Sequence, residues 1–421
     1  MFKFQQYHFN PETYLASFSY EGDDGTNFTE KVQFCKSGEP LNAELLDRAL
    51  FLSFVLIGTS YYKSHPTPTV ALNYALDDFQ ANFFSTVYQE GLSQFAFENK
   101  LTRESLAHFQ STRNDNTPTI ISTPEYHGLL SLQSGGKDSL LTATLLKSQD
   151  PSYLYISSSS SYPQVLDQLG GKLQVIHRSI DHSALQQARG LNGHVPITYI
   201  VQSLALVQAI INHQGTILTS IGREGNEAHA YIHDLAVNHQ WSKTWPAEQI
   251  LAEYVHRYIS PDLNLGSPLR GFSELKIAEL FAQKCWQKYG HSFSSCNVAN
   301  YRQGQDNQTL NWCGECAKCA NTYLLFAPFI PRDELDRLYG GTSLFEKPSL
   351  INIFKGLLGV DGFMKPFECI GEVPELRQAY QLRLPEYPEL PFAVPQSDFD
   401  YQKVTAVQPF VESILAKMEL N

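Results

Sequence analysis

The most chemically suggestive segment of this 421-residue chain is six residues long and reads Ser134, Gly135, Gly136, Lys137, Asp138 and Ser139. It follows an apolar stretch at 128–133, which predicts a strand, and leads into a helical pattern at 139–148. Two adjacent glycines permit a tight turn, in which backbone N–H groups approach a phosphate without interference from a Cβ atom. The start of the helix adds N–H donors and the positive end of its dipole. The sequence therefore predicts a phosphate-binding loop rather than an ordinary glycine turn.

The polar side chains of this loop have separate predicted roles. Ser134 and Ser139 can donate hydroxyl hydrogen bonds, and Lys137 either adds positive charge or faces solvent. The Asp138 carboxylate is a poor phosphate contact, so it either holds a magnesium ion or orients the loop. The string lacks the Gly-Lys-Ser/Thr ending of a Walker loop and resembles the signature of the pyrophosphatase-loop family. That resemblance implies ATP as the nucleotide, attack of a substrate oxygen on its α-phosphate, release of pyrophosphate and an adenylated intermediate.

Four of the seven cysteines are clustered in the sequence. Cys313, Cys316 and Cys319 form two overlapping Cys-x-x-Cys steps, and Cys296 lies upstream. Without a secretory signal, such clustering points to a metal before disulfides. Four thiolates satisfy a closed tetrahedral Zn2+ site with a structural role, whereas the alternative is a loop of reduced, redox-active cysteines. The arrangement resembles the four-Cys zinc site of 7-cyano-7-deazaguanine synthases, which also carry a pyrophosphatase loop.

The elements around the loop predict an α/β fold. Further strands at 153–156, 172–177 and 215–220 and a helix at 196–212 alternate at the spacing of parallel βαβ units. The expected architecture is a parallel, doubly wound sheet of the pyrophosphatase-loop (HUP-like) type. An N-terminal α+β domain and a four-Cys zinc-binding segment accompany it.

The N-terminal region has its own pattern. Alternation at 14–20 and 28–34 predicts a hairpin, Asn42 caps a helical pattern, and a second helical stretch covers about 77–99. Polar residues at 111–124 suggest a linker. Four units are therefore predicted: an N-terminal α+β domain at 1–124, an α/β ATP-binding domain at 125–290, a Cys-cluster segment at 291–330 and a C-terminal helical extension at 331–421.

Composition narrows the function classes. A hydrophobic content of 43% and a charged content of 18% are typical of a folded globular protein. The net charge of -12 weighs against binding of long nucleic acid, because phosphate neutralisation needs a basic surplus. The start of the chain has no secretory signal, and its most apolar stretch, at 50–57, is too short to span a membrane. We expect a soluble cytoplasmic protein with small-molecule partners, whereas its oligomeric state is not predicted.

Several strings away from the loop mix glycine or proline with acid–base side chains. They stand at 192–196, 222–227, 237–243 and 365–372. The string at 222–227 follows a predicted strand, as a ligand loop does in an open α/β sheet. For a single histidine or lysine, a solvated loop or a satisfied core position is the more common explanation. Their number favours a ligand site, although sequence alone does not show that they converge.

Taken in order, these strings resemble the ATP-dependent UDP-N-acetylmuramoyl-L-alanyl-L-glutamate epimerases, the MurL family. The resemblance covers most of the chain and rests on residues 58–63, 134–139, 192–196, 238–243, 296–297, 312–319, 327–329 and 365–373. One departure falls at 219–226, where a serine-rich Ser-Asn-Glu-Arg-Ser-Ala segment is expected before Glu-Gly-Asn and the chain reads Thr-Ser-Ile-Gly-Arg-Glu-Gly-Asn. The resemblance implies inversion of the terminal L-glutamate of UDP-MurNAc-L-Ala-L-Glu through an adenylated carboxylate.

The resemblance also places the candidate site residues. The expected groups for moving the α-proton are His194, His239, Lys243 and Cys369, with Glu372 behind them. A further set, Arg223, Glu224 and Lys365, is expected near the nucleotide or the anionic groups of the substrate. Mg2+ would neutralise the phosphates during adenylation.

Three other functions share parts of this pattern. An amide-forming or nitrile-forming synthase would have the loop and the cysteines but would consume ammonia. A tRNA-modifying adenylase would need a basic surface, which the net charge disfavours. A zinc-bearing interaction protein would not need the serines and the aspartate of an intact phosphate loop.

Overall fold

Alternating apolar and polar side chains build the first three strands, β1 (Phe2–Asn10), β2 (Leu15–Glu21) and β3 (Asn27–Gln33). In β2 every second side chain is buried, as expected where one face of a sheet covers a core. β2 and β3 pair antiparallel along their whole length, which confirms the predicted hairpin. The computed structural model that contains these strands describes residues 1–113, 119–159, 161–223, 225–300 and 308–418.

Short buried strands joined by helices form the other half of the sheet. They are β5 (Leu129–Leu132), β6 (Ser152–Ser157), β7 (Leu173–Ser179), β8 (Thr216–Leu218) and β11 (Asn264–Gly266). All neighbouring pairs among them run parallel, which confirms the predicted βαβ units. The sequence did not predict β11, because three residues carry too little pattern.

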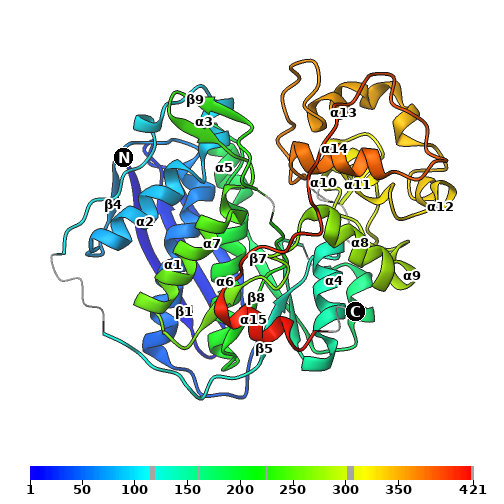
Figure 1. The fold of residues 1–421 in the computed structure, drawn as a ribbon. Coiled ribbons are helices and arrows are strands. Elements are labelled where there is room, and N and C mark those ends of the chain that lie inside the picture. Colours follow the sequence, from blue (N-terminus) through cyan, green and yellow to red (C-terminus); the bar gives the residue numbers. More distant parts are fainter. Residues whose placement is uncertain (114–118, 160, 224, 301–307, 419–421) are drawn as a thin grey trace.

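The two halves form one sheet. β3 pairs antiparallel with β7, and β4 (Val70–Leu72) lies parallel to β1 at the far edge, so nine strands follow the order β11-β8-β5-β6-β7-β3-β2-β1-β4 (Figure 1). The prediction of a parallel sheet is right for the second half and wrong for the sheet as a whole. The alternation of apolar and polar residues predicts a hairpin, but it does not predict which strand of another segment the hairpin will pair with.

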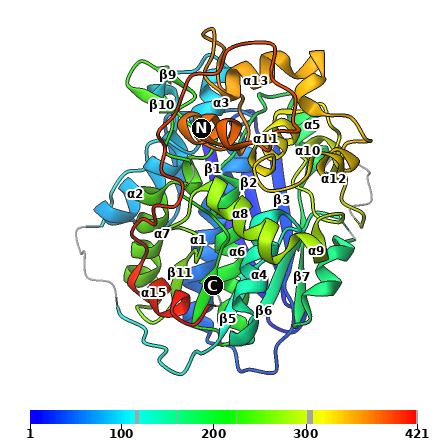
Figure 2. The same ribbon diagram turned by 45° about the vertical axis from the view of Figure 1, so that its right-hand side comes forward.

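Helices cover both faces of the sheet (Figures 1 and 2). One face carries α1 (Ala43–Tyr62), α2 (Asp78–Gln89), α6 (Ile197–Ile211) and α7 (Trp245–Tyr258), and the other carries α4 (Lys137–Leu146) and α8 (Glu274–Lys284). Leu154 belongs to the first hydrophobic core and its neighbours Tyr153 and Tyr155 to the second, because successive side chains of a strand point to opposite faces. The arrangement is therefore doubly wound.

Shorter elements complete the chain. They are α3 (Ser93–Glu98), α5 (His182–Ala188), the hairpin of β9 (Ala230–Ile232) and β10 (Leu235–Val237), α9 (Trp286–Tyr289), α10 (Asn297–Asn300), α11 (Ala317–Phe326), α12 (Arg332–Arg337), α13 (Ile351–Leu357), α14 (Val373–Leu382) and α15 (Pro409–Leu415). The last segment, drawn in red in Figure 2, returns to the parallel edge strand β11, where Phe410 lies close to Gly266.

The predicted helix starts and ends can be compared in the N-terminal region. Asn42 caps α1 as predicted, with its Oδ1 accepting from the Leu45 N–H at 3.0 Å. The single helical stretch predicted at 77–99 is wrong, because α2 ends at Gln89 and α3 begins at Ser93. Gly91 lies in the break, where an added Cβ would meet Pro196 at 3.1 Å. Of the predicted linker, residues 114–118 lie outside the described residues.

Candidate active site

The phosphate loop is the turn between β5 and α4, at the carboxyl edge of the parallel strands. Gly135 adopts a φ of +80°, which favours glycine, and Gly136 is the N-cap residue of α4. The Ser139 hydroxyl accepts from the Ser134 N–H and donates to the Gly136 carbonyl, both at 3.2 Å. In the part of the chain that the structure describes, no side-chain hydrogen bond caps the start of this helix. A glycine turn that ends in an uncapped helix N-terminus is suited to bind an anion.

Lys137 lies beneath the loop and not in solvent. Its side chain is only 7% exposed, and its ammonium pairs with the Asp138 carboxylate and with Glu274 Oε2, the latter at 2.6 Å. The solvent-facing alternative for Lys137 is therefore wrong. Glu274 begins α8, and a Cβ added to Gly222 would lie 3.5 Å from its Oε1. This ion pair thus joins the glycine loop to the start of α8, which lies against the loop that follows β8.

Three histidines form a cluster at the same edge. The ring centroids of His194 and His239 lie 4.2 Å apart, so two of the predicted catalytic residues come together. A third ring, His229, lies 6.3 Å from His239 and stacks on Phe367 at 5.2 Å. The sequence reasoning missed His229, although it stands two residues after the string at 222–227. We call His194, His229 and His239 the histidine cluster.

Burial holds the histidine cluster in the neutral form. Loss of hydration lowers the pKa of His194 to about 3, that of His229 to about 3 and that of His239 to about 4. The ammonium of Lys243 lowers the pKa of both His194 and His239 further. Neutral imidazoles can accept a proton at pH 7, which a general base requires.

The depressed pKa values predict a loss of stability in acid. In the unfolded chain, histidines bind protons below about pH 6.5, whereas the folded histidine cluster resists protonation down to about pH 4. The contribution of the cluster to the free energy of unfolding is therefore fully present above about pH 6.5 and is lost as the pH falls below that value. Each histidine of the cluster is expected to lower the free energy of unfolding by about 2 kcal/mol between pH 7 and pH 5. Urea unfolding of wild type and His229→Phe at both pH values measures this, and the variant should lose about 2 kcal/mol less. Equal losses in both proteins would contradict the prediction.

The segment at 365–373 is held from two sides. Asn297 Nδ2 donates to Glu368 Oε2 at 3.0 Å, the Gly371 N–H donates to Asn321 Oδ1 at 3.0 Å, and Gln240 Nε2 donates to the Ile370 carbonyl at 2.9 Å. Burial raises the pKa of Glu368, and its charge raises the pKa of His239. Glu368 therefore lies beside the histidine cluster, and the sequence reasoning overlooked it within a string that it had selected.

The other predicted residues of this segment lie in different surroundings. The Cys369 thiol is free and half-buried. The backbone carbonyl of Cys369 accepts a hydrogen bond from the Lys318 ammonium. Lys365 pairs with Glu227 Oε2 at 2.7 Å. Glu372 precedes α14, burial raises its pKa, and its Oε1 has no hydrogen-bond partner among the described residues. The charges that act most strongly on Glu372 are therefore those of Lys365 and Glu227.

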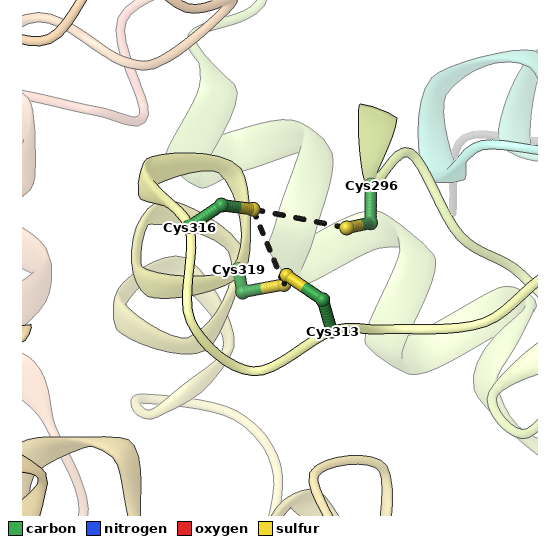
Figure 3. Close-up of side chains that lie close together, drawn as sticks. All are labelled: Cys296, Cys313, Cys316 and Cys319. Atoms are coloured by element: carbon green, nitrogen blue, oxygen red, sulfur yellow. Dashed lines mark hydrogen bonds between the residues drawn. The ribbon is translucent and has the colours of Figure 1, made fainter. Parts of the chain in front are cut away.

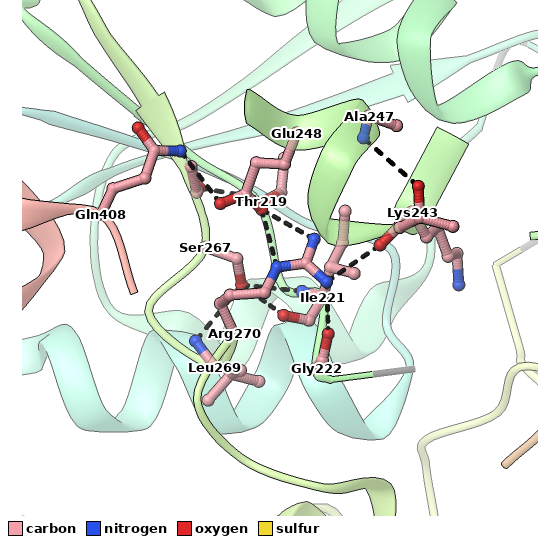
Figure 4. A network of polar contacts seen from close by, with 12 residues as sticks. Thr219, Ile221, Gly222, Lys243, Ala247, Glu248, Ser267, Leu269, Arg270 and Gln408 are labelled. Atoms are coloured by element: carbon pink, nitrogen blue, oxygen red, sulfur yellow. Dashed lines mark hydrogen bonds and ion pairs between the residues drawn. The ribbon is translucent and has the colours of Figure 1, made fainter. Parts of the chain in front are cut away.

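A buried guanidinium fixes the backbone around Lys243. Arg270, 2% exposed, follows β11 and donates through Nε and Nη2 to Glu248 Oε2 at 3.0 and 2.7 Å. Its Nη1 donates to the carbonyls of Gly222 and Lys243 at 2.7 and 2.9 Å (Figure 4). One side chain thus ties two predicted strings together. The sequence reasoning missed Arg270 because it missed the strand that precedes it.

The four predicted cysteines converge. The sulfur atoms of Cys296, Cys313, Cys316 and Cys319 all lie within 4.8 Å of one another (Figure 3). The closest pairs are 3.6 to 3.7 Å apart. Zinc at about 2.3 Å from four sulfurs would set them about 3.8 Å apart, so the observed spacing fits a tetrahedral metal site.

The surroundings of the sulfurs also fit a metal. Backbone N–H groups of Ala299, Gly314 and Glu315 point at three of them, with distances from 3.3 to 3.4 Å. Such donors stabilise thiolates. Cys316 is the N-cap residue of α11, and Cys319 lies in its first turn. The loop and the helix therefore bring together ligands that are distant in sequence.

The predicted anion-binding pair after β8 is only partly described. The Arg223 guanidinium lies 5.0 Å from the Phe399 ring and donates to the Lys403 carbonyl at 3.2 Å, so it contacts the C-terminal extension. Glu224 lies outside the described residues. These residues belong to the segment that departs from the expected serine-rich string.

Short contacts connect the phosphate loop with the histidine cluster. The Ser294 N–H donates to the Gly135 carbonyl at 3.3 Å. Three residues further on, Asn297 holds Glu368 beside His239. The strings that the sequence singled out therefore surround one region at the carboxyl edge of the sheet, as expected for ligand sites of open α/β folds.

An α/β sheet that gathers a glycine loop, neutral histidines and paired lysines at its carboxyl edge has the features of a ligand-binding α/β protein. Comparison with known families identifies the class further. Residues 1–267 match the MurL N-terminal domain, and residues 292–389 match the MurL C-terminal domain.

Individual relatives agree over nearly the whole chain. The UDP-N-acetyl-alpha-D-muramoyl-L-alanyl-L-glutamate epimerase of Xanthomonas oryzae pv. oryzae (strain MAFF 311018) is 29% identical over 430 residues, which cover 100% of this chain and 91% of the relative. The epimerase of the same name from Salinispora tropica is 32% identical, and the match covers 89% of this chain and 82% of the relative. The one from Micromonospora sp. is 31% identical, and the match covers 89% of this chain and 84% of the relative. The chain therefore belongs to the MurL family and is an epimerase, which confirms the resemblance.

The helices were also compared with the length of a membrane span. Within residues 1–113, 119–159, 161–223, 225–300 and 308–418, no helix is both long and apolar enough to cross a membrane.

Proposed function

We propose that the chain inverts the terminal L-glutamate of UDP-MurNAc-L-Ala-L-Glu in peptidoglycan precursor synthesis and uses ATP to do so. The substrate is the one named for the relatives that match from end to end. The observation that carries the ATP step is the glycine loop between β5 and α4, which residues 294–297 connect to the segment beside a cluster of neutral histidines. The loop supplies a place for phosphates, and the cluster supplies bases.

The chemistry explains why both parts are needed. The α-proton of a free terminal glutamate is very weakly acidic, because its removal adds a second negative charge beside the carboxylate. Attack of a carboxylate oxygen on the α-phosphorus of ATP breaks the bond to pyrophosphate and leaves an acyl adenylate, a mixed anhydride whose acyl carbonyl carries no charge although its phosphate keeps one negative charge. A general base can then take the α-proton. Return of a proton to the opposite face inverts the centre, and water cleaves the acyl bond to give D-glutamate and AMP.

The phosphate loop has the binding role in this proposal. Backbone N–H groups around Gly135 and Gly136 would hold the phosphates, with hydroxyl donors from Ser134 and Ser139. The Lys137 ammonium, which pairs with two carboxylates, holds the loop and the start of α8 in fixed relation. Asp138 is the proposed magnesium ligand, and the ion would neutralise the phosphates.

The proton-transfer role falls to the groups around His239. His239 and His194 are neutral, adjacent and half-buried, so each has a ring nitrogen that can accept a proton at pH 7. Lys243, Cys369 and Glu372 stay as candidates for returning the proton or holding the substrate. Glu368 joins them, since it lies close enough to change the pKa of His239.

The cysteines have a structural role in this proposal. A tetrahedral Zn2+ ion held by Cys296, Cys313, Cys316 and Cys319 would leave no open position for a substrate. We further propose that the units at 1–124 and 331–421 form walls of the substrate pocket above the ATP-binding unit at 125–290. The contacts of α3 and of Phe367 with the histidine cluster support this arrangement.

A single assay tests the proposed function. Purified protein is incubated with Mg2+, ATP and UDP-MurNAc-L-Ala-L-Glu, and the glutamate configuration and AMP are measured. We expect D-glutamate and AMP, and incorporation of solvent deuterium at the α-carbon. Formation of AMP only when ammonia or tRNA is added would instead identify a synthase or a tRNA-modifying enzyme. Inversion without ATP would refute the adenylation step while leaving the epimerase intact.

A further inference from the structure

Helix α3 from the N-terminal region docks on both histidine loops. Ser93 Oγ accepts from the Asn238 N–H at 3.2 Å, next to His239. At the other end of the helix, Asn99 Nδ2 donates to the Asn192 carbonyl at 3.0 Å, two residues before His194. A six-residue helix thus fixes the backbone that carries each of these two adjacent histidines.

Two further side chains of α3 make a chain of hydrogen bonds to His239. Gln94, which is 6% exposed, presents its Oε1 to His239 Nδ1 at 2.6 Å. Its Nε2 donates to Glu98 Oε1 at 2.8 Å. Positions 94 and 98 are one helical turn apart, so the carboxylate, the amide and the imidazole follow one another in a line of contacts.

The carboxylate decides which way the amide points. An ionised carboxylate only accepts hydrogen bonds, so Glu98 requires the NH2 group of Gln94 on its side. The amide oxygen must then face His239, and an oxygen can only accept. His239 Nδ1 must therefore carry the ring proton. In a neutral imidazole this leaves Nε2 with a lone pair.

We propose that Glu98 and Gln94 are positioning residues that hold His239 in its Nδ1–H tautomer, so that Nε2 is the proton acceptor toward the glutamate α-carbon. This assignment rests on the proposed function and adds to it a role for the N-terminal region. It differs from a purely structural role for α3, because it requires a particular direction of hydrogen bonding and not merely a filled space.

The charges around His239 are compatible with this assignment. Lys243 and Lys318 disfavour a second proton on the ring, whereas Glu368 and Glu98 favour it. Burial is the largest influence, and the pKa of His239 falls to about 4. The ring is therefore neutral at pH 7, and the only open choice is which nitrogen carries the proton.

The test reads the tautomer directly in the full chain. Histidine labelled with 15N distinguishes a protonated from an unprotonated ring nitrogen by NMR, and His239→Asn identifies the signals of His239. Wild type should show a proton on Nδ1. Glu98→Gln allows the two amides to turn together, so both tautomers should appear and α-deuterium exchange should fall about twofold to tenfold. Gln94→Leu removes the acceptor and should slow exchange by at least about tenfold.

A swapped pair provides the matched control. In Gln94→Glu combined with Glu98→Gln, the new carboxylate at 94 accepts from both His239 Nδ1 and the amide at 98, so the Nδ1–H tautomer and most of the exchange rate should return. A structural role alone predicts that two changes are worse than one. An Nε2–H tautomer in wild type, or an unchanged tautomer in Glu98→Gln, would overturn the positioning role of Glu98 and Gln94 even if the protein inverts glutamate. The expected NMR changes in a protein that inverts no glutamate would refute the proposed function instead.

Discussion

Exchange of Cys316 for serine is expected to abolish zinc binding at the proposed four-cysteine site and to lower the melting temperature of the protein by roughly 5–10 °C. The four sulfurs lie within 4.8 Å of one another, and a hydroxyl at one corner is a poor ligand for zinc. A ligand that binds only the folded state at a thousand times its Kd contributes about 4 kcal/mol, and this contribution disappears with the metal. The shift in melting temperature follows from that loss.

The measurement combines metal analysis with thermal unfolding. Wild type purified with zinc should contain about one metal ion per chain, and Cys316→Ser should contain almost none. Cys35→Ser is a suitable control, because the Cys35 thiol donates to the Val175 carbonyl and lies outside the four-sulfur cluster. Wild type that binds no zinc, or a variant that keeps its metal, would show that the cysteines are packed thiols.

The consequences of metal loss should extend beyond the cluster. Cys319 and its neighbours in α11 belong to the second hydrophobic core, which also contains residues of α4 and α8. Lys318 and Asn321 of the same helix hold the segment at 365–373. The metal would therefore support both the packing behind the phosphate loop and the wall beside the histidine cluster.

The features predicted correctly from sequence are local ones. The frame of the predicted phosphate loop needs only a strand, two glycines and a helix that are consecutive in the chain, and the Cys-x-x-Cys steps set the spacing of three of the four clustered cysteines. Asn42 was recognised as a cap because capping involves a residue three positions away. In each of these cases the physical cause lies within one short segment.

The features that were missed depend on pairing across long distances. Lys31 of β3 lies opposite Ser179 of β7, and no local pattern identifies that partner. Arg270 was overlooked because its importance comes from two carbonyls that lie in other loops. Gln94 reads as an ordinary helix residue, and only the fold places it against His239.

The family resemblance partly replaced the missing information on distant contacts, because it identified functional segments without knowledge of which residues they contact. It selected His194 and His239, which the fold brings to 4.2 Å from one another. It also selected Glu372, which lies beside the Glu227–Lys365 pair, and passed over Glu368 in the same string. A motif match identifies which segments approach the ligand but not which side chain in a segment points inward.

The loop glycine offers the sharpest test of the activating half of the reaction. Gly135→Val is expected to reduce ATP-dependent formation of AMP at least about 100-fold. Gly135 has a φ of +80°, and a Cβ there would lie 2.6 Å from Leu310 Cδ1 and 3.2 Å from Val165 Cγ1. To relieve these contacts, either the Leu310 and Val165 side chains or the loop backbone must move, and a backbone misplacement of about 1 Å at a reacting centre has a cost of that size.

Gly170→Val separates loop displacement from backbone strain. Gly170 has nearly the same φ, +79°, but a Cβ there meets nothing within 4 Å. Both variants therefore carry a similar left-handed strain, and only one of them disturbs the phosphate loop. AMP formation and stabilisation of the protein against heat by ATP should be lost in Gly135→Val and kept in Gly170→Val. If both variants kept AMP formation and the stabilisation by ATP, the phosphates would bind elsewhere. If both variants lost them, backbone strain and not the shape of the glycine turn would be responsible. Only a difference between the two variants assigns nucleotide binding to the glycine turn itself.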